Sequence, residues 1–255
     1  MRPELPGNTS PETQPEQHLT GFRALVQGLL SVAFPVNCMG CGTALPARDR
    51  LLCERCPHER FSDPNPSNAL TCEKLLLPEG ILFQDALWKY DKGGLLNQII
   101  HLLKYEGMAA VGEEVGYYAG RRLQERHIEG ARRFESGAPV LLLPVPLHPK
   151  REQKRGYNQA RQIALGMSRA TALPVADPQL VVRQKNTKTQ TRFSLSERMV
   201  NLKGAFRLTD FSLVQGRHVI IVDDVFTTGS TAFTLAGVLQ EAKPASVSVF
   251  TIGMA

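Results

Sequence analysis

The sequence predicts an α/β protein in which a parallel sheet is flanked by helices, with a small cysteine module near its N-terminus. From about Ile81 onward, apolar runs typical of buried strands alternate with helix-length amphipathic segments, which is the pattern of a parallel α/β sheet. Before that point, two Cys-x-x-Cys pairs lie in a segment too short to build a core of its own. We therefore divide the chain into a tail (1–20), a helix with the cysteine module (21–75) and the α/β domain (80–255).

The first twenty residues are rich in proline and polar side chains, so they bury too little surface to fold, and we expect a disordered tail. They contain no positively charged segment followed by an apolar run, and the apolar stretch over 25–36 is too short to span a bilayer. We expect a cytoplasmic protein without membrane insertion. The 30 Lys and Arg residues against 24 Asp and Glu residues give a net charge of +6, which favours anionic partners.

Two Cys-x-x-Cys pairs separated by eleven residues indicate a zinc site. The four candidate ligands are Cys38, Cys41, Cys53 and Cys56. Four thiolates complete a tetrahedron and leave no position open for a substrate, so the expected role of Zn²⁺ is structural. Disulfides are the alternative, but nothing in the sequence implies an oxidising compartment. Cys72 stands apart from the pairs and is a reserve ligand at most. The apolar positions from Phe22 to Ala33 predict a weakly amphipathic helix that packs on this module or on the main domain.

The main domain is predicted element by element from apolar periodicity and from glycine and proline breaks. In chain order, the pattern predicts helices over 94–105 and 110–127, a strand over 140–146, a basic loop at 150–155, a helix from about 158, a short strand at 181–182, a strand over 219–222 and a helix over 232–243. Four consecutive β-branched residues make 219–222 a typical central parallel strand. His101 lies within the apolar pattern of the first helix, and we expect it to be a core or boundary residue.

A strand-to-helix turn follows the strand over 219–222 and combines two carboxylates with four hydroxyls around a glycine. Backbone N–H groups at the start of a helix form an anion site, and Gly229 allows close approach or a positive φ. Asp223 and Asp224 directly before the turn can bind vicinal hydroxyls or a divalent cation. A ribose 5-phosphate fits both parts of this segment, because its phosphate can bind the turn and its hydroxyls can bind the two carboxylates. The alternative is an acidic turn with a helix cap that binds no ligand. The chain lacks a Gly-x-x-x-x-Gly-Lys-Ser/Thr loop and a Gly-x-Gly-x-x-Gly turn, which argues against nucleoside triphosphatases and dinucleotide folds.

Two basic segments are candidates for a second contact with such a ligand. Arg155 is the expected cation, Gly156 allows close backbone approach, and Asn158 and Gln159 offer amide donors. The alternative is a solvated basic loop that is capped by Asn158. A further polar segment over 183–192 either closes over the ligand and excludes water or follows a nucleic-acid backbone, and its composition does not separate these uses.

The strand, the acidic pair and the hydroxyl-rich turn resemble the signature with which type I phosphoribosyltransferases bind 5-phosphoribosyl 1-diphosphate (PRPP). Further segments are Leu103-Lys104-Tyr105-Glu106-Gly107, Pro-Val-Pro-Leu-His-Pro at 144–149, Arg-Gly-Tyr-Asn-Gln at 155–159, Thr187, Gln190, Leu195, Arg198, Asn201 and Gly204-Ala205-Phe206. Together with the cysteine pairs they resemble the ComF family, which includes ComFC-like and GntX-like proteins, over about 22–251. The resemblance implies a type I phosphoribosyltransferase-like domain with an N-terminal zinc finger.

This resemblance also implies the roles of individual residues. Asp223 and Asp224 would contact ribose and Mg²⁺, and Arg155 would lie near the diphosphate, as catalytic residues. The residues implied in PRPP binding are Val225, Phe226, Thr227, Thr228, Gly229, Ser230, Thr231, Lys104 and Tyr105. The resemblance is compatible with two kinds of function, a DNA-handling protein and an enzyme. One is a PRPP-binding protein of DNA uptake in natural transformation that handles single-stranded DNA, with a competence helicase and other uptake proteins as partners. The alternative is an active phosphoribosyltransferase of nucleotide metabolism.

Overall fold

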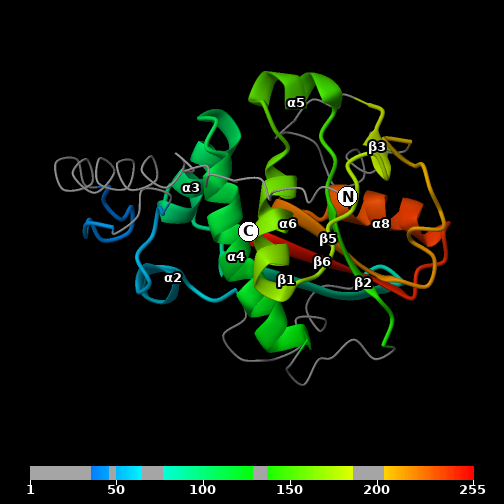
Figure 1. The fold of residues 1–255 in the computed structure, drawn as a ribbon, viewed down its shortest axis with the longest axis horizontal. Coiled ribbons are helices and arrows are strands. Elements are labelled where there is room, and N and C mark those ends of the chain that lie inside the picture. Colours follow the sequence, from blue (N-terminus) through cyan, green and yellow to red (C-terminus); the bar gives the residue numbers. More distant parts are fainter. Residues whose placement is uncertain (1–35, 46–49, 65–76, 129–136, 186–203) are drawn as a thin grey trace, which may run out of the picture.

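The computed structural model describes residues 36–45, 50–64, 77–128, 137–185 and 204–255. The predictions about the tail (1–20), the amphipathic helix, Cys72 and the basic segment beyond Lys185 lie outside these residues. Within them, four parallel strands form one sheet with the order β1-β6-β5-β2, and two further strands form an antiparallel pair (Figure 1).

The elements follow one another along the chain largely as strand and helix in alternation. They are α2 (Cys56–Glu59), β1 (Ile81–Lys89), α3 (Leu95–Tyr105), α4 (Ala109–Leu123), the π-helix η2 (Gln124–Ile128), β2 (Val140–Pro144), α5 (Pro149–Arg155), α6 (Gln159–Thr171), β3 (Val181–Arg183), β4 (Phe206–Leu208), β5 (His218–Phe226), α8 (Ser230–Gln240) and β6 (Ser246–Met254). The predicted helices and strands of the main domain therefore exist, with ends that differ by a few residues.

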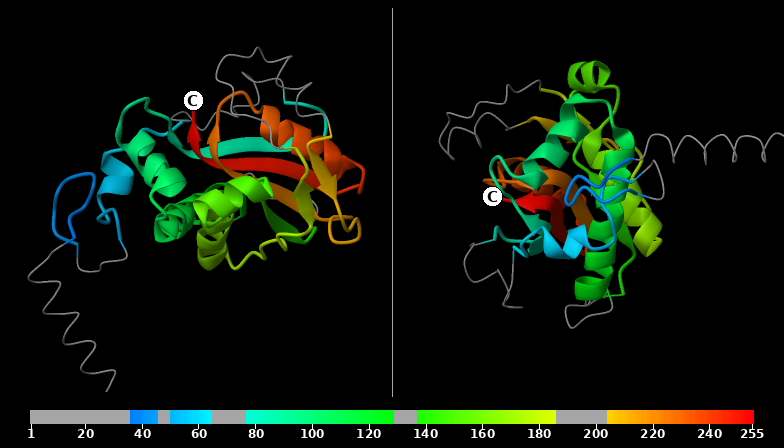
Figure 2. Two further views of the ribbon diagram at one scale, coloured as in Figure 1. Left: turned by 90° about the horizontal axis from the view of Figure 1, so that it is seen from above. Right: turned by 90° about the vertical axis from the view of Figure 1, so that its left-hand side faces the viewer.

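The central strand β5 separates two hydrophobic cores because its side chains alternate between the faces of the sheet. Val219 and Ile221 pack with α8 and with the β3–β4 pair, whereas Ile220 and Val222 pack with α3, α4 and α6. The view from above shows α8 on one side of the sheet and the other large helices on the opposite side (Figure 2). Helices on both faces of a parallel sheet confirm the predicted fold class.

One prediction in this domain is wrong. The basic segment after β2 is the helix α5 and not a loop. The side chain of His148 accepts a hydrogen bond from the Lys150 N–H, Pro149 occupies the first turn, and Gly156 ends the helix with a φ of 87°. This combination of cap, N-terminal proline and C-terminal glycine is a standard helix signature, but the seven-residue length and the lack of apolar positions hide it from a periodicity search.

The cysteine module packs directly on the α/β domain. The Glu114 carboxylate on α4 accepts hydrogen bonds from the backbone N–H groups of Leu51 at 2.6 Å and Leu52 at 3.1 Å. The Trp88 indole on β1 donates to the Pro57 carbonyl at 3.1 Å. Leu52 and Trp88 also belong to the same hydrophobic core as the buried face of α4. A segment with little apolar content thus gains a core by sharing that of the sheet.

Candidate functional site

The two consecutive carboxylates at the carboxyl end of β5 point to opposite faces of the sheet, as neighbouring strand residues must. Asp224 is 6% exposed and faces the side of α3 and α6. Its Oδ2 atom lies 2.9 Å from the Lys104 Nζ atom and accepts a hydrogen bond from the Gln159 Nε2 atom at 3.3 Å. Asp223 lies on the α8 side and borders the cavity of the following turn.

Asp223 has an unusual protonation equilibrium. Burial, and then the neighbouring Asp224 carboxylate, raise the pKa of Asp223 to about 7, against the opposing effects of the Asp224 backbone N–H, Lys104 and Arg183. For Lys104, burial opposes the charge, but the carboxylates of Asp224 and Asp223 prevail and raise its pKa. Consecutive carboxyl groups that affect each other's ionisation in this way are typical of sites that bind a cation or take up protons.

The turn after β5 has the geometry that an anion site requires. Gly229 has a φ of 71° and caps the N-terminus of α8, where backbone N–H groups and the helix dipole favour negative charge. A Cβ atom at Gly229 would lie 2.5 Å from the Phe233 ring and 2.7 Å from the Phe226 ring, so both φ and space require glycine. The hydroxyls of Thr228 and Ser230 lie 2.8 Å apart.

This turn encloses a small cavity of about 50 Å³. Its walls are formed by Asp223, by the run Val225, Phe226, Thr227, Thr228, Gly229, Ser230, Thr231 and Ala232, and by Thr251 of β6. Phe226 is a buried core residue and Thr227 is exposed, so the turn joins the core to the surface within two residues. The chemistry of the lining, hydroxyls and backbone at a helix start, fits a phosphate group.

Arg155, at the end of α5, reaches the acidic pair indirectly. Its guanidinium hydrogen-bonds the Gln159 side-chain oxygen, and the Gln159 amide in turn donates to Asp224. The Asn158 side chain makes its hydrogen bonds away from the acidic pair. Its oxygen accepts from the Ala160 N–H at 3.0 Å and its amide donates to the Val145 carbonyl at 3.0 Å. The helix-cap alternative for Asn158 is therefore confirmed, and Gln159 is an internal link between Arg155 and the acidic pair.

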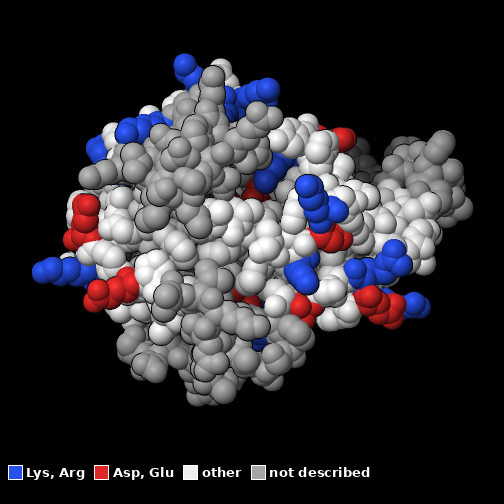
Figure 3. Space-filling model, turned by 180° about the vertical axis from the view of Figure 1, so that it is seen from behind, with Lys and Arg blue, Asp and Glu red and all other residues white. Residues whose placement is uncertain are grey.

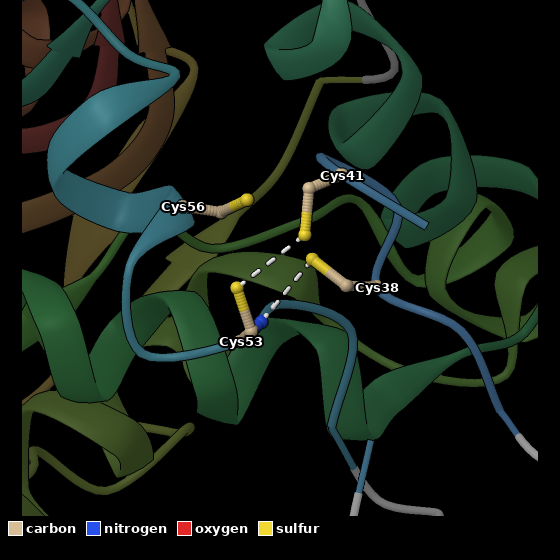
Figure 4. Close-up of side chains that lie close together, drawn as sticks. All are labelled: Cys38, Cys41, Cys53 and Cys56. Carbon is tan, nitrogen blue, oxygen red and sulfur yellow. Dashed lines mark hydrogen bonds between the residues drawn. The ribbon is translucent and has the colours of Figure 1, made fainter. Parts of the chain in front are cut away.

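The four cysteine side chains converge, as Figure 4 shows, although they come from two separate knuckles. Their sulfur atoms all lie within 4.8 Å of one another, and the Cys41 and Cys53 sulfurs are 3.6 Å apart. Tetrahedral zinc with Zn–S bonds of about 2.3 Å requires sulfurs roughly 3.8 Å apart, so the donor set fits this metal. Gly40 is required there, because a Cβ atom at that position would lie 2.6 Å from the Cys56 sulfur.

Hydrogen bonds favour thiolates in part of this cluster. The Cys38 sulfur accepts from the backbone N–H groups of Cys53 at 3.2 Å and Gly40 at 3.4 Å. Contacts with Thr43 and with the other cysteines lower the pKa of Cys41 to about 6, whereas burial raises the pKa of Cys56. Binding of Zn²⁺ would favour the thiolate form of all four cysteines.

Sequence comparison adds relatives to this geometry. No family model matches the chain. DNA utilization protein YhgH of Escherichia coli (strain K12) is 35% identical over 157 residues, which are 62% of this chain and 66% of that protein. Competence protein F of Haemophilus influenzae is 34% identical over 128 residues (50% and 56%), and competence protein ComFC of Bacillus subtilis is 34% identical over 113 residues (44% and 43%).

The chain is a ComF-family homologue. The matched segment covers just under two thirds of the YhgH proteins and about half of the two competence proteins. Solved structures similar to this ComF homologue include an allosteric regulatory enzyme of purine biosynthesis (21% identity, TM-score 0.34, 55% of this chain and 25% of that one). A hypoxanthine phosphoribosyltransferase from Staphylococcus aureus is another (14% identity, TM-score 0.32, 55% and 61%). At these TM-scores the overlap is partial, and the fold class rests on the strand order and helix placement.

The structure brings together most residues that the sequence predicted for the ComF homologue's acidic site. Lys104 contacts Asp224, and Tyr105 lies beside Arg155. The link through Gln159 and the cavity wall at Thr251 depend on packing between distant elements, so no local pattern predicts them. The prediction that His101 is a core or boundary residue is wrong, because this side chain is exposed. None of the helices in the described segments is both long and apolar enough to cross a membrane.

Proposed function

We propose that this ComF homologue binds PRPP together with Mg²⁺ at the carboxyl end of β5 and handles single-stranded DNA during DNA uptake. The names of its relatives, competence proteins and DNA utilization proteins, support the cellular role. The observation that supports the ligand most is the combination, at one sheet edge, of two consecutive, electrostatically coupled carboxylates with a positive-φ turn that starts a helix.

In this proposal each half of PRPP has its own partners. The 5-phosphate binds the turn from Thr227 to Thr231, and the ribose hydroxyls donate to Asp223 and Asp224. Lys104 and Arg155 lie on the side of Asp224, where they can neutralise diphosphate charge. Asp223 and Asp224 would hold Mg²⁺, which would supply positive charge to neutralise the diphosphate.

The experiment that tests this ligand is a calorimetric titration with PRPP and Mg²⁺. The double variant Asp223→Asn/Asp224→Asn is expected to lose binding while it stays folded, because the amides keep the shape of the site but not its charge. Glu241→Gln is the matched control, since Glu241 is an exposed carboxylate at the other end of α8. Unchanged PRPP affinity in the double variant would show that Asp223 and Asp224 do not bind this ligand.

Transfer of the phosphoribosyl group to an acceptor is the second candidate function. It is favoured by the two cations, Lys104 and Arg155, near the acidic pair, because a departing diphosphate needs positive charge. Diphosphate release from PRPP in the presence of candidate bases tests it directly. Release above the rate of a PRPP solution would support turnover, and its absence would leave binding alone.

We also propose that the cysteine cluster holds structural Zn²⁺. Removal of the metal by a chelator is expected to unfold the segment around Cys38–Cys56 and to release it from Glu114, since the segment has little core of its own. Metal analysis should give about one zinc per chain. Thr43→Ala, which changes a neighbour of Cys41 but no thiol, is expected to retain the metal, and Cys53→Ser to lose it.

A further inference from the structure

Tyr105, the last residue of α3, projects from the surface beside the acidic pair. It is 69% exposed, the largest value among the prominent exposed apolar side chains of the described residues. The preceding residue, Lys104, contacts Asp224, and Tyr105 itself lies beside Arg155, which is linked to Asp224 through Gln159. A tyrosine ring combines a flat apolar face with a polar end, so an exposed one is able to stack on a planar ligand when other groups beside it contribute.

Two other planar groups lie next to the Tyr105 ring. The imidazole of His101, one turn earlier on the same helix face, has its centroid 4.8 Å away. The Arg155 guanidinium lies 5.9 Å from the ring centroid, within the range of a cation–π contact. A tyrosine ring, an imidazole and a guanidinium are the groups on which proteins stack flat heteroaromatic rings.

Arg155 also connects this aromatic group to a strip of positive charge. It ends α5, which carries Lys150, Arg151, Lys154 and Arg155 against the single acid Glu152 and has no buried residue. Lys and Arg gather along the upper edge of the molecule in Figure 3, the edge at which α5 projects in Figure 1. Positive charge next to an exposed aromatic ring is the arrangement by which proteins bind single-stranded nucleic acids.

A second cavity, of about 950 Å³, is lined by residues of the cysteine module and of α4 but is less suited to a nucleic acid. Its arginines are paired: Arg121 lies 3.6 Å from Glu125 and Arg169 lies 3.8 Å from Glu113. A phosphate backbone would have to displace these acids, so α5 and Tyr105 are the better place for a nucleic acid.

We propose that Tyr105, with His101 and Arg155 beside it, stacks a base of single-stranded DNA whose phosphates run along α5. This inference rests on the proposed function, because it names the place at which the DNA is held. A duplex cannot bind in this way, since its bases are stacked on one another and do not reach an isolated ring. The bound base would lie beside Arg155, which is linked to Asp224 through Gln159.

The test measures separately how much the DNA bases and the DNA phosphates contribute to binding affinity. Fluorescence anisotropy compares a labelled oligothymidylate with an abasic oligonucleotide of the same length, for the wild type, Tyr105→Leu and Tyr105→Phe. The wild type is expected to bind oligothymidylate about tenfold more tightly than the abasic strand. Tyr105→Leu should abolish that difference, and Tyr105→Phe, which keeps the ring, should retain it. Because Tyr105 is largely exposed, both variants should melt like the wild type.

The phosphate contacts have their own variant. Lys150→Ala/Lys154→Ala is expected to weaken binding of both strands alike and to reduce the slope of log affinity against log salt by about 1.4. Equal affinity of the wild type for both strands, or an undiminished preference in Tyr105→Leu, would overturn the stacking site. Equal binding of duplex DNA with the same dependence on Tyr105 would also overturn it. If the wild type binds neither strand, the DNA role fails as well, whereas the PRPP titration still decides the ligand site.

Discussion

Two carboxylates of the same sheet, Asp85 in β1 and Asp223 in β5, have pKa values shifted in opposite directions. Asp85 is 1% exposed, and its Oδ2 atom lies 2.9 Å from the His127 Nε2 atom. Its Oδ1 atom accepts from the Ala86 N–H at 2.8 Å and lies 3.5 Å from Arg126. Burial opposes ionisation of Asp85, but His127, Arg126 and that N–H outweigh it and lower the pKa.

Asp223 has the opposite surroundings. The charge that affects it most is the Asp224 carboxylate, and burial and Asp224 together raise its pKa to about 7. A buried acid that the fold itself neutralises stabilises the structure, whereas one that the fold leaves poorly neutralised is stabilised only when a ligand, a metal ion or a proton arrives. Asp85 is buried and Asp223 is half-buried, yet the less buried acid has the raised pKa, so the charges around each acid decide the direction of its shift.

The largest expected effect is at Asp85. Asp85→Ala leaves His127 and Arg126 facing a buried gap and should lower the free energy of unfolding by about 3–5 kcal/mol. Asp85→Asn keeps the shape and one hydrogen bond and should cost less. Because the folded pKa is lowered, this stability is present above the ordinary value of 3.8 and is lost as the pH falls below it. Urea unfolding between pH 3 and 8 measures the stability of each variant and its dependence on pH. An Asp85→Ala variant as stable as the wild type would contradict a structural role for Asp85.

Asp223→Asn should change the free energy of unfolding in the opposite direction and stabilise the protein at high pH. A raised folded pKa means that the stability from this group is present below pH 3.8 and is lost as the pH rises through about 7. The Asn variant removes that loss, so at pH 8 it should be more stable than the wild type by on the order of 2 kcal/mol, and at pH 4 nearly equal to it. The same unfolding series measures this difference. A variant destabilised at pH 8 would show that Asp223 is a structural acid like Asp85.

Gly229→Ala should lower stability by roughly 1–3 kcal/mol, because alanine at a φ of 71° is strained and its Cβ meets the Phe226 and Phe233 rings. PRPP affinity should fall with it, since the turn must shift. Gly237→Ala is the matched control in the same helix, where a Cβ has nothing within 4 Å and should stabilise slightly. Thermal unfolding and PRPP titration of the pair separate strain in the turn from a general effect on α8.

The smallest effect is expected at Lys104. Lys104→Gln removes the cation 2.9 Å from Asp224 but leaves the Gln159 hydrogen bond and supplies another amide donor, so it should lower stability by only about 1 kcal/mol. It should also move the pH at which the wild type loses stability upward, since the acidic pair then ionises less readily. An unchanged pH profile would show that Lys104 does not neutralise the pair.

The acidic turn and the cysteine pairs could be predicted from the sequence because each is a short run whose chemistry is local. The neighbours that distinguish Asp85 from Asp223 could not, since His127, Arg126 and Lys104 lie on elements placed by long-range packing. Asp85 itself appears in the sequence as one acid within an apolar run, with no sign of its partners. Helix α5 was missed for a different reason, as its signals are caps and not apolar periodicity.

An NMR titration of the aspartate carboxyl carbons with and without PRPP and Mg²⁺ distinguishes the two acids directly. Asp223 is expected to titrate near pH 7 in the free protein and at lower pH when the ligand is bound, while Asp85 titrates below 3.8 in both states. An Asp223 that titrates like an ordinary aspartate, or whose titration ignores the ligand, would contradict this expectation.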